Sequence, residues 1–447
     1  MADYLDALIE RLKTSKTGPV AGTLREMREH QYGIPLPHFA QQHLFGATGI
    51  RIWCFVSIQG KAGVGKSTLL YDLCGLVAGA VEDGGLGGMS FVYDTEHKTD
   101  PRFQLSVLLK HGDRAVRACR VMPTETLEKC LEVFNAGVLK SYVEVCPDRS
   151  APMLVGIDSI GGSGSEDTIE KVETKGAVGK GFTNKAHIVK HWCENQSSIL
   201  DRYRVPAVIV CINQEKEGIP APGMTVAPKT ITGGGSQGFK CGYMISVTRP
   251  ATKANGSLLR LKTVKSSYSD PRSVDVDLRW DVHGSKDGED VDNARFLWAL
   301  ASARLLQTPD RLIGDLKSIC DVTVSDKELV TCPQLGLRSV QPEEFEAALF
   351  SEEHADVLEG LYRFFKIERI RSVAEYPEHI AQEKAELKSL DKALKEKQAE
   401  ANAAAEEALK AKAQKAYAKR AAKTPAVAVS IQPPAPPASK EVSDGDK

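Results

Sequence analysis

The 447-residue sequence has no run of about eighteen consecutive apolar residues, and its N-terminus has no secretory apolar segment. Its ten cysteines form no C-x-x-C pair, and Cys54, Cys74 and Cys211 lie inside apolar runs. Cysteines in such positions are typical of buried thiols in a reducing compartment, not of a disulfide framework or a zinc site. These absences predict a cytoplasmic protein with no membrane partner.

The sequence also lacks an excess of charge of one sign, since 58 lysines and arginines are balanced by 59 aspartates and glutamates. A net charge of −1 gives the whole chain no attraction for nucleic acid. Affinity for DNA would therefore have to come from local charge and main-chain donors. Apolar residues make up 42% of the chain, as in a globular core, and the length suggests two or three folding units.

Residues 60–67 read Gly-Lys-Ala-Gly-Val-Gly-Lys-Ser and match the phosphate-loop pattern G-x-x-x-x-G-K-[S/T] at every required position. They lie between an apolar run at 53–58, typical of a strand, and a helical pattern at 68–77. Glycines let main-chain N–H groups surround phosphate oxygens, while Lys66 reaches the β- and γ-phosphates and Ser67 completes a Mg²⁺ shell. The motif predicts that a nucleoside triphosphate and Mg²⁺ are bound by Gly60, Gly63, Gly65, Lys66, Ser67 and Thr68.

Two further apolar runs lead to carboxylates. Residues 152–157 are followed by Asp158, which we expect to hold Mg²⁺ through water. Residues 89–93 lead towards Glu96. In an open parallel sheet the C-terminal ends of the strands converge on the ligand crevice, so Glu96 is well placed to deprotonate the water that attacks the γ-phosphate.

Another apolar run, 205–212, ends in the amides Asn213 and Gln214 instead of a carboxylate. Gln214 is a candidate sensor that detects the γ-phosphate and passes its presence to the segment that follows. The order Asn213-Gln-Glu-Lys216 lacks the Asn-Lys-x-Asp that reads guanine, so ATP is favoured over GTP.

The chain resembles the RecA recombinases, and the phage UvsX-type branch fits best. The resemblance rests on the order of the phosphate loop, Asp-Thr-Glu-His-Lys-Thr-Asp-Pro at 94–101, Ile-Asp-Ser at 157–159, Asn-Gln at 213–214 and Thr-Ile-Thr-Gly-Gly-Gly at 230–235. It covers residues 35–281, roughly half of the chain. It implies an α/β fold, namely a RecA-like P-loop ATPase core with a mostly parallel sheet, and, if a phage encodes the protein, location in the host cytoplasm.

The resemblance also implies roles for individual residues. It implies phosphate or metal binding by Lys66, Ser67 and Asp158, water activation by Glu96, nucleotide sensing by Gln214, and adenine contacts by Asp100 and Phe103. The segments after Ser159 and Gln214 would be mobile DNA-binding loops.

One departure from the family concerns its interface cations. The family places two cations of one subunit against the nucleotide of the next, in a Lys-x-Lys or Lys-x-Arg element, whereas this chain has Lys265-Ser-Ser267. Lys265 matches and is expected to assist catalysis there. Because one cation stabilises less transition-state charge, we expect slow hydrolysis, or substitution by another basic residue such as Lys262 or Arg272.

Neither expected DNA loop is a basic patch. In 161–185 the lysines are accompanied by acids, and 215–237 carries Lys216 and Lys229 among prolines, glycines and a few apolar side chains. Such a loop can offer N–H groups to phosphates and insert a side chain between bases, but aromatic residues for stacking are almost absent. The local sequence is equally compatible with DNA-binding loops and with ordinary surface loops.

Five regions are expected along the chain: an N-terminal oligomerisation segment (1–49), the ATPase core with its loops (50–282), a mainly helical C-terminal domain (283–372), a charged Ala/Lys/Glu-rich helix (373–423) and a disordered proline-rich tail (424–447). Shorter helices are expected at 4–12, 293–305 and 343–367. The long helix has apolar residues seven positions apart, but charged residues at some of the other positions that would face a partner. This pattern favours a solvated single helix over a coiled coil. Its basic last turns leave open a contact with DNA or an acidic partner.

Together these features predict an ATP-dependent recombinase that forms filaments on single-stranded DNA and promotes homologous pairing and strand exchange. Double-stranded DNA and single-strand-binding or mediator proteins are possible further partners. Two alternatives stay open. One is a hexameric RecA-like helicase or motor ATPase, and the other is a non-catalytic filament or regulatory protein that uses ATP for assembly.

Overall fold

The computed structural model describes residues 31–97, 101–124, 126–164, 169, 182–217, 229–231, 240–253, 256–281, 302–306, 312–313, 316–317 and 321–421. The expected helix at 4–12 and the tail at 424–447 lie outside these residues. The chain divides into two compact units, Met1–Gln382 and Glu383–Lys447. Among the described helices, none is both long enough and apolar enough to cross a membrane.

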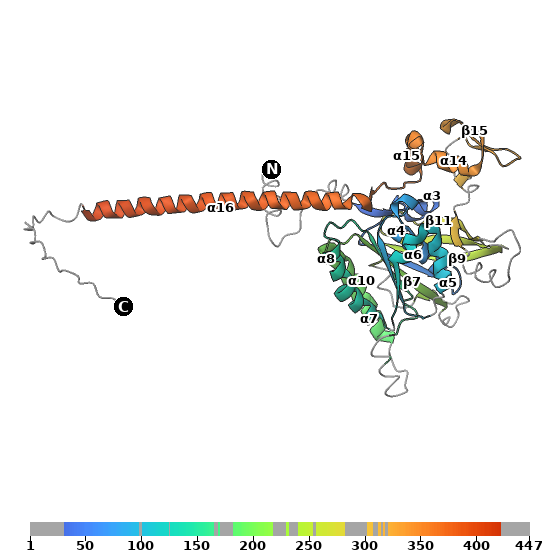
Figure 1. Ribbon diagram of the computed structural model, residues 1–447, viewed down its shortest axis with the longest axis horizontal. Coiled ribbons are helices and arrows are strands. Elements are labelled where there is room, and N and C mark those ends of the chain that lie inside the picture. The colour runs from blue at the N-terminus through green and yellow to red at the C-terminus, as the bar shows by residue number, and fades with distance from the viewer. Residues whose placement is uncertain are drawn as a thin grey trace, which may run out of the picture. The chain divides into compact units, whose positions relative to one another are not determined.

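The first unit is built on a ten-stranded sheet (Figure 1). Its strands are β3 (Phe55–Gly60), β4 (Met89–Asp94), β5 (Cys119–Pro123), β6 (Met153–Asp158), β7 (Ala207–Glu217), β8 (Lys229–Ile231), β9 (Tyr243–Lys253), β10 (Gly256–Ser266), β11 (Ser273–Asp281) and β12 (Ser302–Leu306). The order is β12-β11-β10-β9-β3-β7-β6-β4-β5, with β8 paired to β7. From β9 to β5 all neighbours are parallel, whereas β9 to β12 and the β7–β8 pair are antiparallel. The chain is thus an α/β protein with a large, mostly parallel central sheet.

The central parallel strands are near-continuous apolar runs because helices cover both faces of the sheet. All six residues of β3 are buried, as are the first five of β6. One face packs against α4 (Lys66–Ala78), α5 (Pro101–Leu108) and α6 (Gly112–Ala118), with the 3₁₀ turns η1 (Val81–Asp83) and η2 (Leu109–His111) between them. The other packs against α7 (Leu127–Glu132), the π-helical turn η3 (Val133–Val138), α8 (Leu139–Val145) and α10 (Phe182–Arg202), and Figure 1 shows these two groups apart.

A three-stranded sheet joins segments from distant parts of the sequence. Its order is β16-β1-β2, where β1 is Tyr32–Pro35, β2 is Gly49–Arg51 and β16 is Arg371–Ser372. Helix α3 (Phe39–Phe45) connects β1 to β2 and ends at Gly46, whose φ of 68° suits a glycine. Residues 32–50 contribute several side chains to the core that contains α4. The described part of the expected N-terminal segment is therefore integrated into the first unit.

Two expectations for the C-terminal half require correction. Residues 302–305 were expected to end a helix, but they belong to β12, which pairs with β11 at the edge of the central sheet. The main-chain hydrogen bonds that these residues make with β11 outweigh their local preference for a helix. Tertiary context commonly overrides such a preference. The central sheet consequently extends past residue 282.

The second correction concerns the domain expected to be mainly helical. Its described residues include a sheet of order β13-β14-β15, formed by Thr323–Val324, Val330–Cys332 and Leu337–Val340. Helices α14 (Pro342–Leu349) and α15 (Ala355–Phe364) match the helical region expected at 343–367 to within one residue at its start. The 3₁₀ turn η5 (Glu352–His354) separates them, while η4 (Pro333–Leu335) precedes and η6 (Val373–Glu375) follows them in the sequence. This region has its own apolar core and is mixed α and β.

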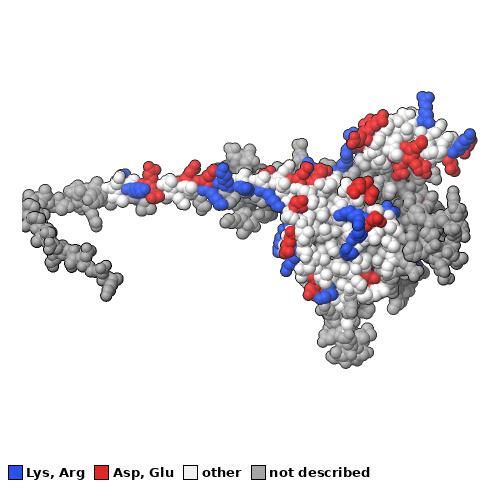
Figure 2. All heavy atoms as spheres, viewed as in Figure 1, with Lys and Arg blue, Asp and Glu red and all other residues white. Residues whose placement is uncertain are grey.

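Helix α16 (Tyr376–Ala421) runs close to the range expected for the charged helix. Tyr376 and Ile380 are buried in the core of the first unit. In the second unit the described side chains from 384 to 415 are exposed, and pairs such as Glu406 and Lys410, 3.2 Å apart, lie one turn apart on the helix. Lys, Arg, Asp and Glu are interspersed over the face of the molecule in Figure 2, as the net charge of −1 would suggest.

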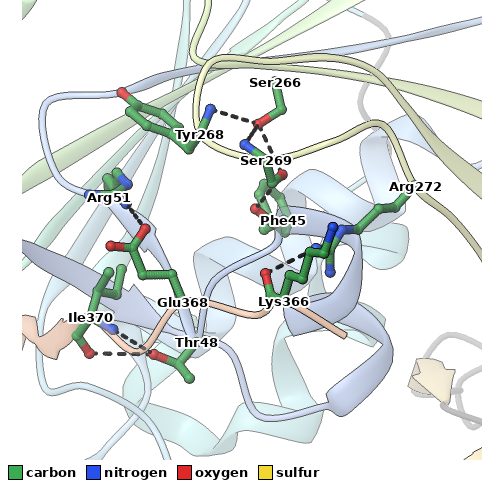
Figure 3. A network of polar contacts seen from close by, with 10 residues as sticks. All are labelled: Phe45, Thr48, Arg51, Ser266, Tyr268, Ser269, Arg272, Lys366, Glu368 and Ile370. Carbon is green, nitrogen blue, oxygen red and sulfur yellow. Dashed lines mark hydrogen bonds and ion pairs between the residues drawn. The ribbon is translucent and has the colours of Figure 1, made fainter. Parts of the chain in front are cut away.

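A polar network fixes three segments to one another, namely 45–51, 266–272 and 366–370 (Figure 3). Arg51 Nη2 donates to Glu368 Oε2 over 2.5 Å, and Arg272 Nη2 donates to the carbonyl of Lys366 over 3.0 Å. Ser269 Oγ donates to the carbonyl of Phe45 over 3.3 Å. The chain leaving α15 is therefore anchored to the turn between β10 and β11.

Candidate functional site

The parallel register brings the C-terminal parts of four strands, β3, β7, β6 and β4, together on the same side of the central sheet. Gly60 of β3 pairs with Gln214 of β7, and Asp94 of β4 pairs with Asp158 of β6. In such sheets ligands commonly bind at the C-terminal ends of neighbouring parallel strands, and these residues lie together there. The order of strands in the sheet thus unites segments that are far apart in the sequence.

Residues 60–65 form a glycine-rich loop that enters the N-terminus of α4. Gly63 and Gly65 have φ values of 71° and 103°, which side chains disfavour. A Cβ on Gly60 would lie 2.4 Å from the carbonyl oxygen of Val247, so a side chain there would require the backbone to move. The loop therefore depends on its glycines for its path, and it leads into the N-terminus of α4, where the first main-chain N–H groups have no partner within the helix.

Lys66 is buried at the start of α4 and folds back over the glycine-rich loop. Its ammonium donates to the carbonyls of Gly60, at 3.1 Å, and Lys61, at 2.6 Å. Burial lowers the pKa of Lys66, and the carboxylates of Asp158 and Glu96 act in the opposite direction. An anion at the N-terminus of α4 would offer this ammonium a further partner.

Ser67 and Asp158 are joined directly. Ser67 Oγ donates to Asp158 Oδ2 over 2.8 Å. Burial raises the pKa of Asp158 to about 6, although the hydrogen bond from Ser67 opposes this, while the charges of Glu96 and Asp94 add to it. Hydroxyl and carboxylate oxygens are ligands that suit Mg²⁺.

The described residues contain no cluster of three or more His, Cys, Asp or Glu side chains that could hold a metal ion. Mg²⁺ is commonly bound by one or two protein oxygens together with water and phosphate oxygens, not by an all-protein cage. The pair of Ser67 and Asp158 fits that mode.

Glu96 lies just beyond β4, and its carboxylate has two side-chain donors. Ser159 Oγ and Gln214 Nε2 both donate to Glu96 Oε1, the latter over 3.1 Å. The main-chain N–H of Gly162 donates to Ser159 Oγ over 3.1 Å, and a Cβ on Gly162 would lie 2.1 Å from Glu96 Cγ. Thr95 Oγ1 accepts from the N–H of Ser159 over 3.1 Å. The carboxylate is therefore oriented by the chain that leaves β6 and by the end of β7.

Sequence reasoning did not identify Ser159, Gly162 and Thr95 as residues that orient Glu96. Ser159 directly follows Asp158, and glycines follow it, so a short polar residue at this strand end was the available signal. The contact itself depends on the path of the chain after β6.

Lys265 does not lie with the other candidates in its own chain. Met244 of β9 pairs with Ser57 of β3 on one side and with Lys265 of β10 on the other. Lys265 is therefore level with Ser57, three residues before Gly60, and its ammonium donates to the carbonyl of Cys241 over 3.0 Å.

The two proposed substitutes for a second cation differ in position. Lys262 pairs with Ser246, which also pairs with Gln59, so its backbone is nearer the level of the glycine-rich loop. Lys262 is exposed. Arg272 donates to the carbonyl of Lys366 instead, as Figure 3 shows.

The remaining candidates are Thr68, Phe103, Asp100 and the two expected DNA loops. Thr68 is buried in the first turn of α4. Phe103 lies in α5 but its side chain is outside the described set, as is all of Asp100. Most of 161–185 and of 215–237 is also outside it, except that β7 continues to Glu217 and pairs with β8.

A cavity of about 230 Å³ lies elsewhere, among β1, β2, α15 and β16. Gln42, Tyr362 and Arg369 are among its lining residues, and it includes none of the candidates above.

A search of protein-family models finds no match to the chain, and a search of curated proteins finds none either.

Proposed function

We propose that the protein is an ATP-hydrolysing recombinase of the RecA type, closest to the phage UvsX-type branch, that polymerises on single-stranded DNA and promotes homologous pairing and strand exchange. One observation carries the proposal. The glycine-rich loop, the Ser67–Asp158 pair and the Glu96–Gln214 pair lie at the C-terminal ends of adjacent parallel strands. This is the arrangement in which a P-loop ATPase holds a triphosphate, a metal and an attacking water.

The proposed roles follow from the contacts of each side chain. Main-chain N–H groups of the glycine-rich loop and α4 hold phosphate oxygens, and Lys66 turns from the carbonyls of Gly60 and Lys61 to the β- and γ-phosphates. Ser67 and Asp158 hold Mg²⁺, which neutralises charge on the phosphates when bound. ATP is the favoured nucleotide, because the residues after β7 lack the guanine-reading pattern.

Glu96 is the proposed general base. Its carboxylate accepts hydrogen bonds from Ser159 and Gln214, and these two contacts fix its orientation. It takes a proton from the attacking water as the water oxygen bonds to the γ-phosphorus and the bond to the β–γ bridging oxygen breaks, releasing ADP. Gln214 is the proposed sensor, since its amide can exchange Glu96 for a γ-phosphate oxygen.

The position of Lys265 supports the proposed assembly of subunits into a filament. Its backbone lies level with Ser57 and its ammonium donates to the carbonyl of Cys241, before β9, away from the strand ends of its own chain where the triphosphate would bind. In a filament it would act on the nucleotide of the adjacent subunit. With Ser267 in place of a second cation, the proposed hydrolysis is slow.

DNA would be held by main-chain donors and local charge, because Figure 2 shows charges of both signs interspersed on the visible face. The β7–β8 hairpin begins directly after Gln214, which supports a link between the γ-phosphate and a DNA-binding segment. Duplex DNA, single-strand-binding proteins and mediator proteins are proposed as further partners, and the cytoplasm of the cell, or of a phage host, as the location.

The test is ATP hydrolysis without DNA, with single-stranded DNA and with duplex DNA, each at two salt concentrations because phosphate contacts are salt-sensitive. We expect stimulation by single strands and loss of turnover in Lys66→Ala and Glu96→Ala. Full DNA-stimulated turnover in both variants would reject the site. Negative-stain images with ATP and DNA should show open filaments, and closed rings would point to a helicase or motor ATPase.

The serine at position 267 favours one second candidate, an ATP-dependent filament protein with negligible hydrolysis. That protein would retain nucleotide-dependent assembly while showing no stimulation of turnover by any DNA.

A further inference from the structure

Glu215 follows Gln214 on β7, and its side chain reaches over the end of β3. Its Oε1 accepts a hydrogen bond of 3.3 Å from Ser246 Oγ on β9. In the sheet β3 lies between β7 and β9, and Gln59 of β3 pairs with Asn213 on one side and Ser246 on the other. The contact between Glu215 and Ser246 therefore crosses β3 where the glycine-rich loop begins.

The Glu215 carboxylate also acts on Lys66. It is the third carboxylate, after those of Asp158 and Glu96, whose charge favours the ammonium form of Lys66. The proposed function gives roles to the first two and leaves Glu215 without one. A triphosphate on Lys66 would bring its own negative charge close to Glu215, and like charges at short range in a partly buried site repel strongly.

Glu215 is also the first residue of the β7–β8 ladder. It pairs with Ile231, and the ladder continues with Lys216 opposite Thr230 and Glu217 opposite Lys229. Displacement of Glu215 would shift the base of this hairpin directly.

We infer that Glu215 is a latch, a positioning residue that holds the β7–β8 hairpin against Ser246 in the absence of triphosphate and leaves Ser246 when the γ-phosphate arrives. This inference rests on the proposed binding of ATP. Gln214 detects the γ-phosphate by attraction, through a hydrogen bond, whereas Glu215 detects it by repulsion. Opening the latch consumes part of the binding free energy of ATP. The latch therefore weakens nucleotide affinity and couples nucleotide binding to the position of the β7–β8 hairpin.

The rate of hydrogen exchange of the main-chain amides at 215–217 and 229–231 reports whether the latch is closed, without any enzymatic assay. We would measure it on the full-length protein with and without Mg²⁺ and the slowly hydrolysed analogue ATPγS. In the wild type, nucleotide should speed exchange of these amides by about fivefold, because the ladder loosens when Glu215 leaves Ser246.

Two variants separate charge from hydrogen bonding. Glu215→Gln keeps an acceptor oxygen for Ser246 but loses the repulsion, so ATPγS should bind about threefold more tightly and change exchange by less than about twofold. Ser246→Ala keeps the charge but loses the hydrogen bond, so exchange should already be fast without nucleotide. Glu217→Gln is the matched control, since it removes the same charge from the same hairpin two residues further on, and it should behave as the wild type.

Identical behaviour of Glu215→Gln and Glu217→Gln, in a protein whose wild type binds ATPγS, would overturn the latch and leave the proposed function intact. No ATPγS binding by the wild type, with Lys66→Ala as reference, would overturn both. Tighter binding and loss of the exchange response in Glu215→Gln alone would establish the latch.

Discussion

Ser67 Oγ donates a hydrogen bond of 2.8 Å to Asp158 Oδ2, and this contact joins the first turn of α4 to the end of β6. The donated proton leaves the lone pairs of the Ser67 oxygen available to a cation. Asp158 is at the same time held beside that oxygen, although burial disfavours its charged form. The pair therefore keeps the two oxygens that we propose to bind Mg²⁺ together, at an energetic cost that a cation would relieve.

The first prediction concerns pH. Because burial raises the pKa of Asp158 to about 6, its carboxyl group is protonated below that pH and ionised above it. Only the ionised form attracts Mg²⁺, so affinity for Mg²⁺ with ATP should fall about tenfold per pH unit below the pKa and level off above about pH 7. Isothermal titration over this range measures it. Asp158→Asn is the control and should lack the part of this step that the Asp158 carboxyl causes. A midpoint near the ordinary aspartate value in the difference between wild type and variant would refute the assignment.

The second prediction concerns stability without metal. A carboxyl group whose folded pKa is raised binds more protons in the folded state, so its ionised form destabilises the fold above that pKa. Asp158→Asn should therefore stabilise the metal-free protein at about pH 8 by up to about 3 kcal/mol, at about 1.4 kcal/mol per pKa unit. Urea unfolding checks this, and the gain should shrink at about pH 5. An equal gain at both pH values would mean that charge is not the cause.

The third prediction concerns Gly162. An alanine there would place Cβ 2.1 Å from Glu96 Cγ, so the carboxylate would have to leave Ser159 and Gln214. For Gly162→Ala we expect kcat to fall about a hundredfold, the usual worth of a positioned general base, with ATP affinity nearly unchanged.

The adjacent glycine supplies the control for that variant. A Cβ on Gly161 would lie 3.5 Å from Ser159 Oγ, its nearest neighbour, which is an ordinary contact. Gly161→Ala should retain most of the turnover measured by steady-state ATP hydrolysis. If both variants were equally active, the close approach of Gly162 to Glu96 would have no role in orienting the base.

The sequence was sufficient to predict which strand ends meet, because Asp158, Glu96 and Gln214 each follow an apolar run and parallel strands end at one edge. The orientation of Glu96 could not be predicted in this way. It depends on Ser159 and Gly162, which reach Glu96 only through the turn after β6. No periodicity in the sequence encodes such a turn.

The errors in the fold have a similar origin. Residues 302–306 have a pattern compatible with a helix, but the edge of β11 offers them a ladder of main-chain hydrogen bonds. Strands of two to four residues, such as Thr323–Val324, are too short to show alternation, so the sheet of β13, β14 and β15 was missed.

The last prediction concerns the Arg51–Glu368 ion pair of Figure 3. The Arg51 side chain is 10% exposed and lies over the Tyr268 ring, 4.6 Å from its centroid. Glu368→Ala leaves this buried cation without its carboxylate, so the free energy of unfolding should fall by about 3 kcal/mol. Glu359→Ala is the matched control, because Glu359 pairs with Arg369, whose side chain is 68% exposed, and such pairs contribute less than about 1 kcal/mol. Urea unfolding compares the two variants. Equal losses would show that the buried pair does not anchor the segment after α15.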